Sequence, residues 1–227
     1  MLTIRLAGQE AQLHPCGALA LPEHGALLVA DAHFGKAVSF RKLGVPVPAG
    51  TTADNLARLD AALSATRARH LVFLGDFLHS ARSHAEGTLA LLHAWRARHP
   101  GLRVTLVRGN HDDRAGDPPA SLGFAVVDEP LRLGPFALCH HPKPVAGAYV
   151  LAGHWHPCVG VSGRAHERLR LPCFWLGADT GILPAFGSFT GMHRIERREG
   201  DRVFAVAGEV VREVPPMPLS LNDGKMP

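Results

Sequence analysis

Three short apolar runs, separated by amphipathic segments, constrain the fold of this 227-residue chain most strongly. The runs cover residues 26–30, 71–74 and 104–107, and each is typical of a strand buried on both faces. Between them, residues 51–67 carry leucines at helical spacing, and a second helix is expected from residue 83 to about 99. Strands that alternate with helices in this way predict an α/β fold with parallel strands.

The second half of the chain has a different sequence pattern. After residue 113, short apolar runs separated by Gly and Pro predict mostly β structure with antiparallel pairs. The expected strands cover residues 125–127, 131–133, 136–139, 149–152, 169–176 and 203–206. Because no linker divides the chain, we expect a single domain over residues 1–214, followed by a flexible C-terminal tail over residues 215–227.

Composition and charge exclude several classes of protein. Hydrophobic residues make up 46% of the chain and charged residues 19%, which excludes extended disorder. The apolar runs are too short to cross a bilayer, and we expect no secretory signal and no membrane association. Four widely spaced cysteines predict reduced thiols and a cytoplasmic location. A net charge of +4 permits a polyanionic partner without requiring one.

Polar side chains follow five of the apolar runs, at the point where each expected strand ends. The clusters are Asp31 and His33; Asp76 and His79; Asn110, His111 and Asp112; His140 and His141; and His154 and His156. In open α/β sheets, ligands bind beyond the carboxyl ends of the strands. The five clusters are therefore expected to meet on one rim.

Each cluster alone has an ordinary explanation as a turn, a helix cap or a solvated histidine. Together they form a set of Asp, Asn and His donors without Cys, which suits a divalent ion such as Mn²⁺, Fe²⁺ or Zn²⁺. A carboxylate can bridge two ions, and two ions about 3.5–4 Å apart can hold a hydroxide and grip a phosphoryl group. The set therefore favours metal-dependent phosphoryl chemistry.

The order D-x-H, G-D-x-x-H, G-N-H-D, a strand-end His and G-H-x-H resembles the calcineurin-like metallophosphoesterases, over residues 29–157. The resemblance implies a four-layer α-β-β-α sandwich of two mixed sheets flanked by helices. It also implies two divalent metal ions, with Mn²⁺ expected and Fe²⁺ or Zn²⁺ as alternatives.

The same resemblance implies a role for each matching residue. Asp31, His33 and His156 match ligands of the first ion, and Asp76 matches the bridging carboxylate. Asn110, His154 and one of His140 or His141 match ligands of the second ion. We prefer His140, because it is the first residue after the strand, although family members usually have a small residue where this chain has His141.

Three further residues match catalytic positions. His111 matches the histidine that contacts the substrate phosphate and protonates the leaving group, and Asp112 would orient its imidazole. His79 ends a segment, residues 75–79, that resembles the G-D-L-F-H segment of double-strand-break repair nucleases, where the last histidine positions the DNA phosphate. An equally good interpretation of His79 is a histidine at a helix start with a local hydrogen bond.

Residues 183–191 and the compact length of the chain carry a second resemblance, to a narrower group of proteins. Both are similar to the bacterial ligase-associated DNA-damage-response phosphoesterases, a proposed endonuclease group. This implies a phosphodiesterase that cleaves DNA in repair, by in-line attack of a metal-bridging hydroxide with His111 as proton donor. DNA is then the expected substrate, with functional association to an ATP-dependent DNA ligase, a helicase and an exonuclease-like protein.

Two other functions stay open on the residues alone. The same metal chemistry also serves a nucleotide, a pyrophosphate-linked compound or another small substrate. A non-catalytic scaffold with the same fold is less favoured, because every expected ligand position is filled. Cations near the expected rim are candidates for contact with a DNA backbone: Lys36, Arg41, Lys42, Arg82, Arg108 and Arg114.

Overall fold

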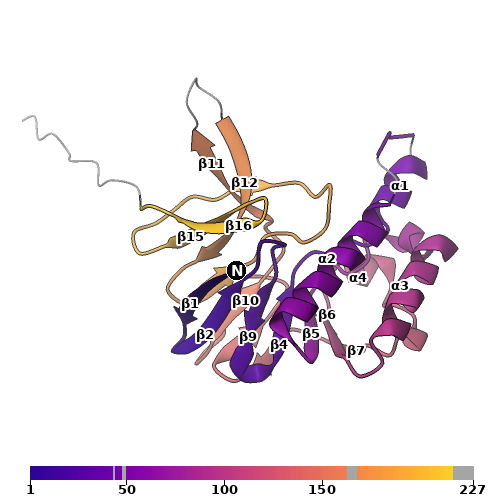
Figure 1. Cartoon of the computed structure of the whole chain (residues 1–227), viewed down its shortest axis with the longest axis horizontal. Helices are drawn as coiled ribbons and strands as arrows, with labels where there is room; N and C mark the ends of the chain where they lie inside the picture. Colours follow the sequence, from indigo (N-terminus) through magenta and orange to yellow (C-terminus); the bar gives the residue numbers. More distant parts are fainter. Residues whose placement is uncertain (43, 48–49, 163–167, 217–227) are drawn as a thin grey trace, which may run out of the picture.

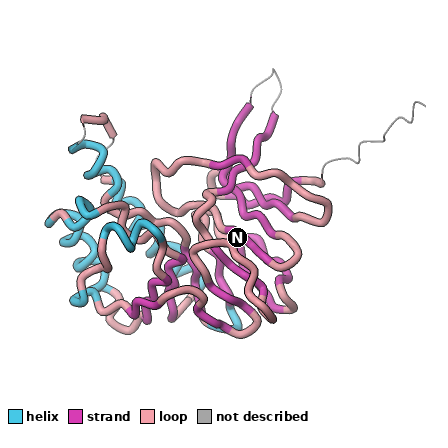
Figure 2. The backbone as a smooth tube through the Cα atoms, turned by 180° about the vertical axis from the view of Figure 1, so that it is seen from behind, coloured by secondary structure: helices cyan, strands magenta, loops and turns pink. Residues whose placement is uncertain are grey.

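The computed structural model describes residues 1–42, 44–47, 50–162 and 168–216, and most of the expected C-terminal tail lies outside this range. Two β-sheets pack face to face, and the four α-helices of the described residues lie together on one side of the molecule (Figure 1). A view from behind shows the same separation of helices from the bulk of the strands (Figure 2). No helix in the described ranges is long and apolar enough to span a membrane.

In the described part of the chain, the first sheet contains seven strands, which lie in sequence order. They are β1 (Leu2–Leu6), β2 (Gln9–Leu13), β3 (Leu19–Leu21), β4 (Ala26–Val29), β5 (His70–Leu74), β6 (Arg103–Val107) and β7 (Ala125–Val127). Neighbours from β1 to β4 are antiparallel, whereas β4 to β7 are parallel. The three apolar runs therefore form the parallel strands that the sequence predicts.

The central strands are buried on both faces because their side chains alternate between two cores. On β4, Leu27 and Val29 belong to the core under the helices, whereas Ala26 and Leu28 belong to the core between the sheets. The strands β5 and β6 alternate in the same way. A continuous apolar run is what such a position requires.

The helices pack on the outer face of the first sheet. They are α1 (Lys36–Lys42), α2 (Thr51–Thr66), α3 (Glu86–Arg98) and α4 (Asn110–Ala115), with 3₁₀ turns η1 (Pro22–His24), η2 (Ala81–His84) and η3 (Ala120–Leu122). Leu56, Leu59 and Leu63 of α2 and Trp95 of α3 are buried in the core there. The second expected helix begins three residues later than its sequence predicts, because Ser80 and Ser83 cap the short turn η2 instead.

Within the ranges that the structure describes, the second sheet contains nine strands. They are β8 (Leu131–Leu133), β9 (Phe136–Leu138), β10 (Tyr149–Ala152), β11 (Pro157–Ser162), β12 (Arg168–Leu176), β13 (Thr180–Ile182), β14 (His193–Arg194), β15 (Arg202–Ala207) and β16 (Val210–Val214). Most pairs are antiparallel, as expected. However, β10 is parallel to both of its neighbours, β9 and β13, and β14 is parallel to β11.

The expected pair of mixed sheets with helices is confirmed, with one difference in the outer layers. All α-helices in the described ranges precede Gly123, so they flank the first sheet. The outer face of the second sheet carries only small apolar clusters, which loop residues such as Val145 and Ile195 cover.

Candidate metal centre

The polar clusters of five strands meet at one rim of the two sheets. Residues after β4, β5 and β6 of the first sheet lie against residues after β9 and β10 of the second. Groups of ligand atoms within 4.8 Å of one another include Asp31, His33 and His156; Asp31, Asp76 and His140; and His140, His141 and His154. The convergence that the sequence predicts is therefore present.

Asp76 lies between two sets of donors, with one carboxylate oxygen toward each. Its Oδ2 is 3.7 Å from Nε2 of His33, and its Oδ1 is 3.5 Å from Nε2 of His140. The Oδ1 atom also accepts a hydrogen bond of 2.9 Å from the backbone N–H of His111. Asp76 thus has the position that a carboxylate shared by two ions needs.

The first set consists of Asp31, His33 and His156. Oδ1 of Asp31 is 3.5 Å from Nε2 of His156, and this buried oxygen has no hydrogen-bond partner in the described residues. The Nδ1–H of His156 donates to the carbonyl of Gly191, so Nε2 is left to face Asp31. Burial holds the pKa of His33 far below its usual value, which keeps the ring neutral, as a metal ligand must be.

The second set surrounds Nε2 of His140. This atom is 2.9 Å from Oδ1 of Asn110 and 2.9 Å from Nδ1 of His154, while Nδ1 of His140 donates to the carbonyl of Leu74. Two adjacent ligands that each lie about 2.1 Å from one ion are themselves about 3 Å apart. Burial, and then the neighbouring His140, lower the pKa of His154. The set therefore has the spacing that suits a divalent ion, and His154 is held in the neutral form that a ligand needs.

His141 is held differently from His140. Its Nδ1 pairs with Oε1 of Glu129 at 2.9 Å, and its side chain is 30% exposed, whereas His140 is completely buried. Oε2 of Glu129 accepts the backbone N–H groups of both histidines, at 2.8 and 2.9 Å. This geometry favours His140 as the ligand. Glu129 was missed at the sequence level, although Asp128 and Glu129 are a sixth polar pair at a strand end, after β7.

Backbone strain is concentrated at the candidate ligands. Only eight non-glycine residues of the described chain have positive φ, and five of them are Asp31, His33, Asp76, His154 and His156. Such conformations cost of the order of 1–3 kcal/mol each and persist where the surrounding structure enforces them. Together with the unpartnered Oδ1 of Asp31, this strain fits a site that is completed by bound cations.

Glycines bring the backbone close to the candidate ligands. A Cβ at Gly153 would lie 2.5 Å from Oδ2 of Asp31, and one at Gly109 would lie 2.5 Å from Oδ1 of Asp76. A Cβ at Gly75, which also has a φ of +78°, would overlap the ring of His140. These strand ends have no space for a larger residue without displacing a ligand.

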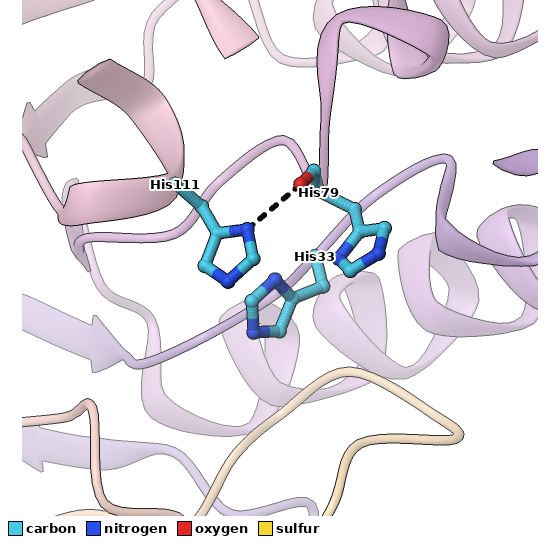
Figure 3. Close-up of side chains that lie close together, drawn as sticks. All are labelled: His33, His79 and His111. Atoms are coloured by element: carbon cyan, nitrogen blue, oxygen red, sulfur yellow. Dashed lines mark hydrogen bonds between the residues drawn. The ribbon is translucent and has the colours of Figure 1, made fainter. Parts of the chain in front are cut away.

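His33, His79 and His111 lie close together (Figure 3). Nδ1 of His111 donates to the backbone carbonyl of His79 at 2.8 Å, and Nε2 of His111 lies 4.0 Å from Oδ2 of Asp76. The rings of His79 and His111 are stacked with centroids 5.2 Å apart. Burial, and then the nearby Lys36, lower the pKa of His79 to about 4, so its ring is neutral at pH 7.

The expected contact between Asp112 and the imidazole of His111 is not formed, and this expectation is corrected. Oδ1 of Asp112 accepts the backbone N–H groups of Phe77 and Leu78, at 3.0 and 3.3 Å, and Oδ2 accepts that of Gly109 at 3.0 Å. Burial raises the pKa of Asp112 to about 6 despite these bonds. Asp112 therefore ties the loop after β5 to the start of α4, and the carbonyl of His79 orients the His111 ring.

One cation expected near the rim already has partners. The Arg108 guanidinium forms ion pairs of 2.7 Å with Asp117 and with Asp128. Lys36 is partly buried, and this burial lowers the pKa of its ammonium group, although Asp76 and Asp31 act in the opposite direction. Of these two, Lys36 is the cation that interacts with the candidate ligands.

Three comparisons relate the chain to known proteins. The sequence matches the calcineurin-like phosphoesterase family over residues 26–147, which is more than half of the chain. The crystal structure of the nuclease MPE from Pseudomonas putida is similar, with 45% sequence identity, a TM-score of 0.83, and coverage of 94% of this chain and 99% of that chain. A search of curated proteins gave no match.

Two other solved structures are much less similar. The protein of unknown function AQ665 from Aquifex aeolicus has 19% identity and a TM-score of 0.38, over 58% of this chain and 78% of that one. The phosphoesterase Yfce from E. coli has 13% identity and a TM-score of 0.43, over 83% of this chain and 97% of that one. The family match and the similarity to nuclease MPE lead to the same conclusion: this chain belongs to the calcineurin-like phosphoesterases.

Proposed function

We propose that the protein is a metal-dependent nuclease that hydrolyses phosphodiester bonds of DNA. The observation that carries this proposal is the position of Asp76, with one oxygen toward His33 and the other toward His140. A carboxylate in that position suits a pair of metal ions, and the chain belongs to a family of phosphoesterases. The similarity to the nuclease MPE, at 45% identity over nearly the whole chain, supports DNA as the substrate.

The donors divide into two sets that share Asp76. Asp31, His33 and His156 would hold the first ion, and Asn110, His140 and His154 the second. Ions bound there supply positive charge for the phosphoryl oxygens and lower the pKa of water. We propose Mn²⁺ as the physiological ion, since oxygen and imidazole donors without thiolates suit it, and Fe²⁺ or Zn²⁺ as substitutes.

His111 is placed to handle the proton of the leaving group. The carbonyl of His79 can only accept a hydrogen bond, so Nδ1 of His111 carries a hydrogen and Nε2 is the atom that faces Asp76. When His111 is protonated, Nε2–H can donate a proton to the oxygen that departs from phosphorus. We assign His111 as the general acid on this geometry.

His79 and Asp112 support this site in different ways. The backbone of His79 orients His111, and its neutral ring lies against His111 and His33, where it can contact a substrate phosphate. Asp112 is a positioning residue, because it accepts three backbone N–H groups from the segments that carry His79 and Asn110. Neither residue is proposed as a metal ligand.

We extend the proposal to the cellular setting. All four cysteines are free, which is consistent with a cytoplasmic protein that acts in DNA repair. An association with an ATP-dependent DNA ligase, a helicase and an exonuclease-like protein follows from the narrower family resemblance. We also propose that residues 1–214 form one domain, because a continuous core joins the two sheets.

Reconstitution with metal tests the proposed function. The protein is stripped with EDTA, restored with Mn²⁺, and assayed on single-stranded DNA, duplex DNA, a panel of nucleotides and a generic phosphodiester. We expect the stripped protein to be inactive and the restored protein to cleave DNA. Hydrolysis of nucleotides without cleavage of DNA would instead favour the small-substrate function, and no hydrolysis by a metal-loaded protein would favour a scaffold.

A pair of aspartate variants links the activity to the proposed centre. Asp76→Ala should lose bound metal and activity together, because it removes the shared carboxylate. Asp117→Ala is the matched control, since Asp117 is a surface carboxylate that pairs with Arg108. A fully active Asp76→Ala protein is incompatible with a pair of ions at this site.

A further inference from the structure

A cavity adjoins the metal centre on the side of the second sheet. It has a volume of about 730 Å³, within the usual range for small-ligand sites. His154, a candidate ligand of the second ion, forms part of its wall. The other lining residues that matter here are Trp155, Trp175, His193, Arg194, Glu196 and Arg198.

Trp155 is the most unusual residue of this cavity. It lies between His154 and His156, yet its side chain is 47% exposed. Only its backbone is bound, through a 2.9 Å hydrogen bond from its N–H to the carbonyl of Gly153. Among the described residues, the indole has no hydrogen bond and no ring contact. Trp is enriched at binding surfaces, because its ring offers a large apolar face and its indole N–H a hydrogen bond, so this exposed ring in a cavity wall is a candidate contact for a ligand.

Trp175 forms a fixed wall of the same cavity. Its Nε1–H donates to Oδ2 of Asp201 at 2.9 Å, and Asp201 also accepts the backbone N–H of Arg198 at 2.7 Å. The strand β14 pairs with the start of β11. His193 and Arg194 therefore lie beside the loop that carries His156. The cavity is therefore built from three separate segments held by hydrogen bonds.

The charges that line the cavity favour an anion. Arg194 and Arg198 are exposed cations that line the cavity. Glu196 is the one carboxylate among these lining residues, so the cations are in excess. Aromatic rings together with cations match a nucleobase with its neighbouring phosphate.

We propose that this cavity binds one unstacked nucleobase of the substrate, next to the phosphate that is cleaved. The base stacks on Trp155, and Arg194 and Arg198 pair with the phosphate on its far side. The inference rests on the proposed nuclease function and deepens it, because it specifies which part of the substrate is recognised. A small nucleotide could present the same base and phosphate, so the experiment includes both sources.

The test uses the loss of a single base. End-labelled single-stranded oligothymidylates, each with one abasic nucleotide at a different position, are cleaved by the Mn²⁺-loaded protein, and the cut sites are mapped. We expect the wild type to lose cleavage by roughly tenfold or more at one phosphate, at a fixed distance from the missing base. The other phosphates should be cleaved as in the intact oligonucleotide.

Variants of Trp155 connect this effect to the cavity. Trp155→Ala should cleave the intact oligonucleotide roughly tenfold or more slowly and should no longer respond to the abasic position. Trp155→Phe, which keeps an aromatic face, should restore much of the response. Leu91→Ala is the matched control, because Leu91 is an exposed apolar residue of α3, outside this cavity. Circular dichroism and bound metal are measured for every variant.

Each outcome decides between the possibilities. Cleavage of DNA by the wild type with no effect of any abasic position overturns this inference and leaves the nuclease function intact. An abasic effect that Trp155→Ala retains places the base elsewhere and also overturns it. If the wild type cleaves no DNA but hydrolyses thymidine 5′-(p-nitrophenyl phosphate) with the same dependence on Trp155, the cavity is a base site for a small nucleotide and the nuclease function fails.

Discussion

Nδ1 of His111 donates a 2.8 Å hydrogen bond to the backbone carbonyl of His79. A carbonyl cannot donate, so this contact fixes one tautomer of the His111 ring and directs Nε2 toward Asp76. Because the partner is a backbone atom, a substitution of the His79 side chain leaves the orienting group in place. The same contact joins the loop that follows β5 to the helix α4, whose N-terminus carries Asn110.

Replacement of His111 by Ala should separate catalysis from metal binding. We expect turnover to fall by roughly 10²- to 10⁴-fold, the usual contribution of a general acid, while the metal content stays that of the wild type. Metal analysis and steady-state kinetics of the purified variant measure the two quantities. His93→Ala, at a half-buried position of α3, is the control and should keep full activity. Loss of metal from His111→Ala would show that His111 is a ligand.

Glu129 should control the metal affinity without taking part in catalysis. Its carboxylate holds the backbone of His140 and both the backbone and the ring of His141. We expect Glu129→Ala to weaken metal binding by about 10- to 100-fold, as is typical for groups that orient ligands. Titration of activity with Mn²⁺ should show normal turnover at saturation, and Asp128→Ala should behave as wild type. A normal affinity in Glu129→Ala would mean that Leu74 alone orients His140.

A methyl group at Gly75 should displace His140. Gly75 has a φ of +78°, and a Cβ there would overlap the His140 ring. We expect Gly75→Ala to lower both the metal affinity, by roughly tenfold or more, and the melting temperature. Gly87→Ala is the matched control, because Gly87 lies in α3 and a Cβ added there would have no atom within 4 Å. This control should change stability by no more than about 1 kcal/mol. Equal metal affinities of the two variants would contradict this account.

His70 should make the folding stability depend on pH. Its Nδ1 accepts from Arg103 at 2.6 Å and its Nε2–H donates to Thr105 at 2.9 Å, an arrangement that requires a neutral ring. Burial, and then Arg103, lower the pKa of His70 to about 4. Since the unfolded chain binds the proton near pH 6.5, stability should fall by up to about 3 kcal/mol as the pH drops from 6.5 to 4.

Denaturant unfolding of the wild type and of His70→Gln, at several pH values, measures this contribution. Gln cannot titrate, so the variant should lose the part of the pH dependence that His70 contributes. The comparison is made on metal-free protein, so that protonation of the candidate ligands does not enter through metal release. Parallel stability profiles for the two proteins would show that His70 titrates normally in the folded state.

Much of the fold was predictable because buried strands require continuous apolar runs. The runs at β4, β5 and β6 are long enough to be distinguished from turns, and the polar residues that follow them gather as predicted. Strands β2 and β3 were not identified: three of the five residues of β2 are polar, and β3 is only three residues long. The start of α3 was misplaced because Ser83 belongs to a capping pair that closes the preceding turn.

The partners within the site were harder to predict than its members. The residues of the site can be predicted, because they follow the ends of predicted strands. Their individual hydrogen bonds depend on the conformation of the loops, which the sequence pattern does not reveal. Asp112 was therefore assigned to the ring of His111, whereas it binds three backbone amides. Glu129 acts from a strand end that carried no histidine and no glycine, so it lacked the pattern of the other clusters.

The candidate ligands come from both sheets: Asp31, His33, Asp76 and Asn110 follow strands of the first, and His140, His154 and His156 follow strands of the second. Ions bound between them would link the two sheets, because each ion would have ligands from both sheets. Removal of the ions would therefore weaken the association of the two sheets and also abolish the activity. In a cell starved of the metal, the protein should accordingly open and be degraded sooner, so that supply of the ion sets the amount of the enzyme together with its activity.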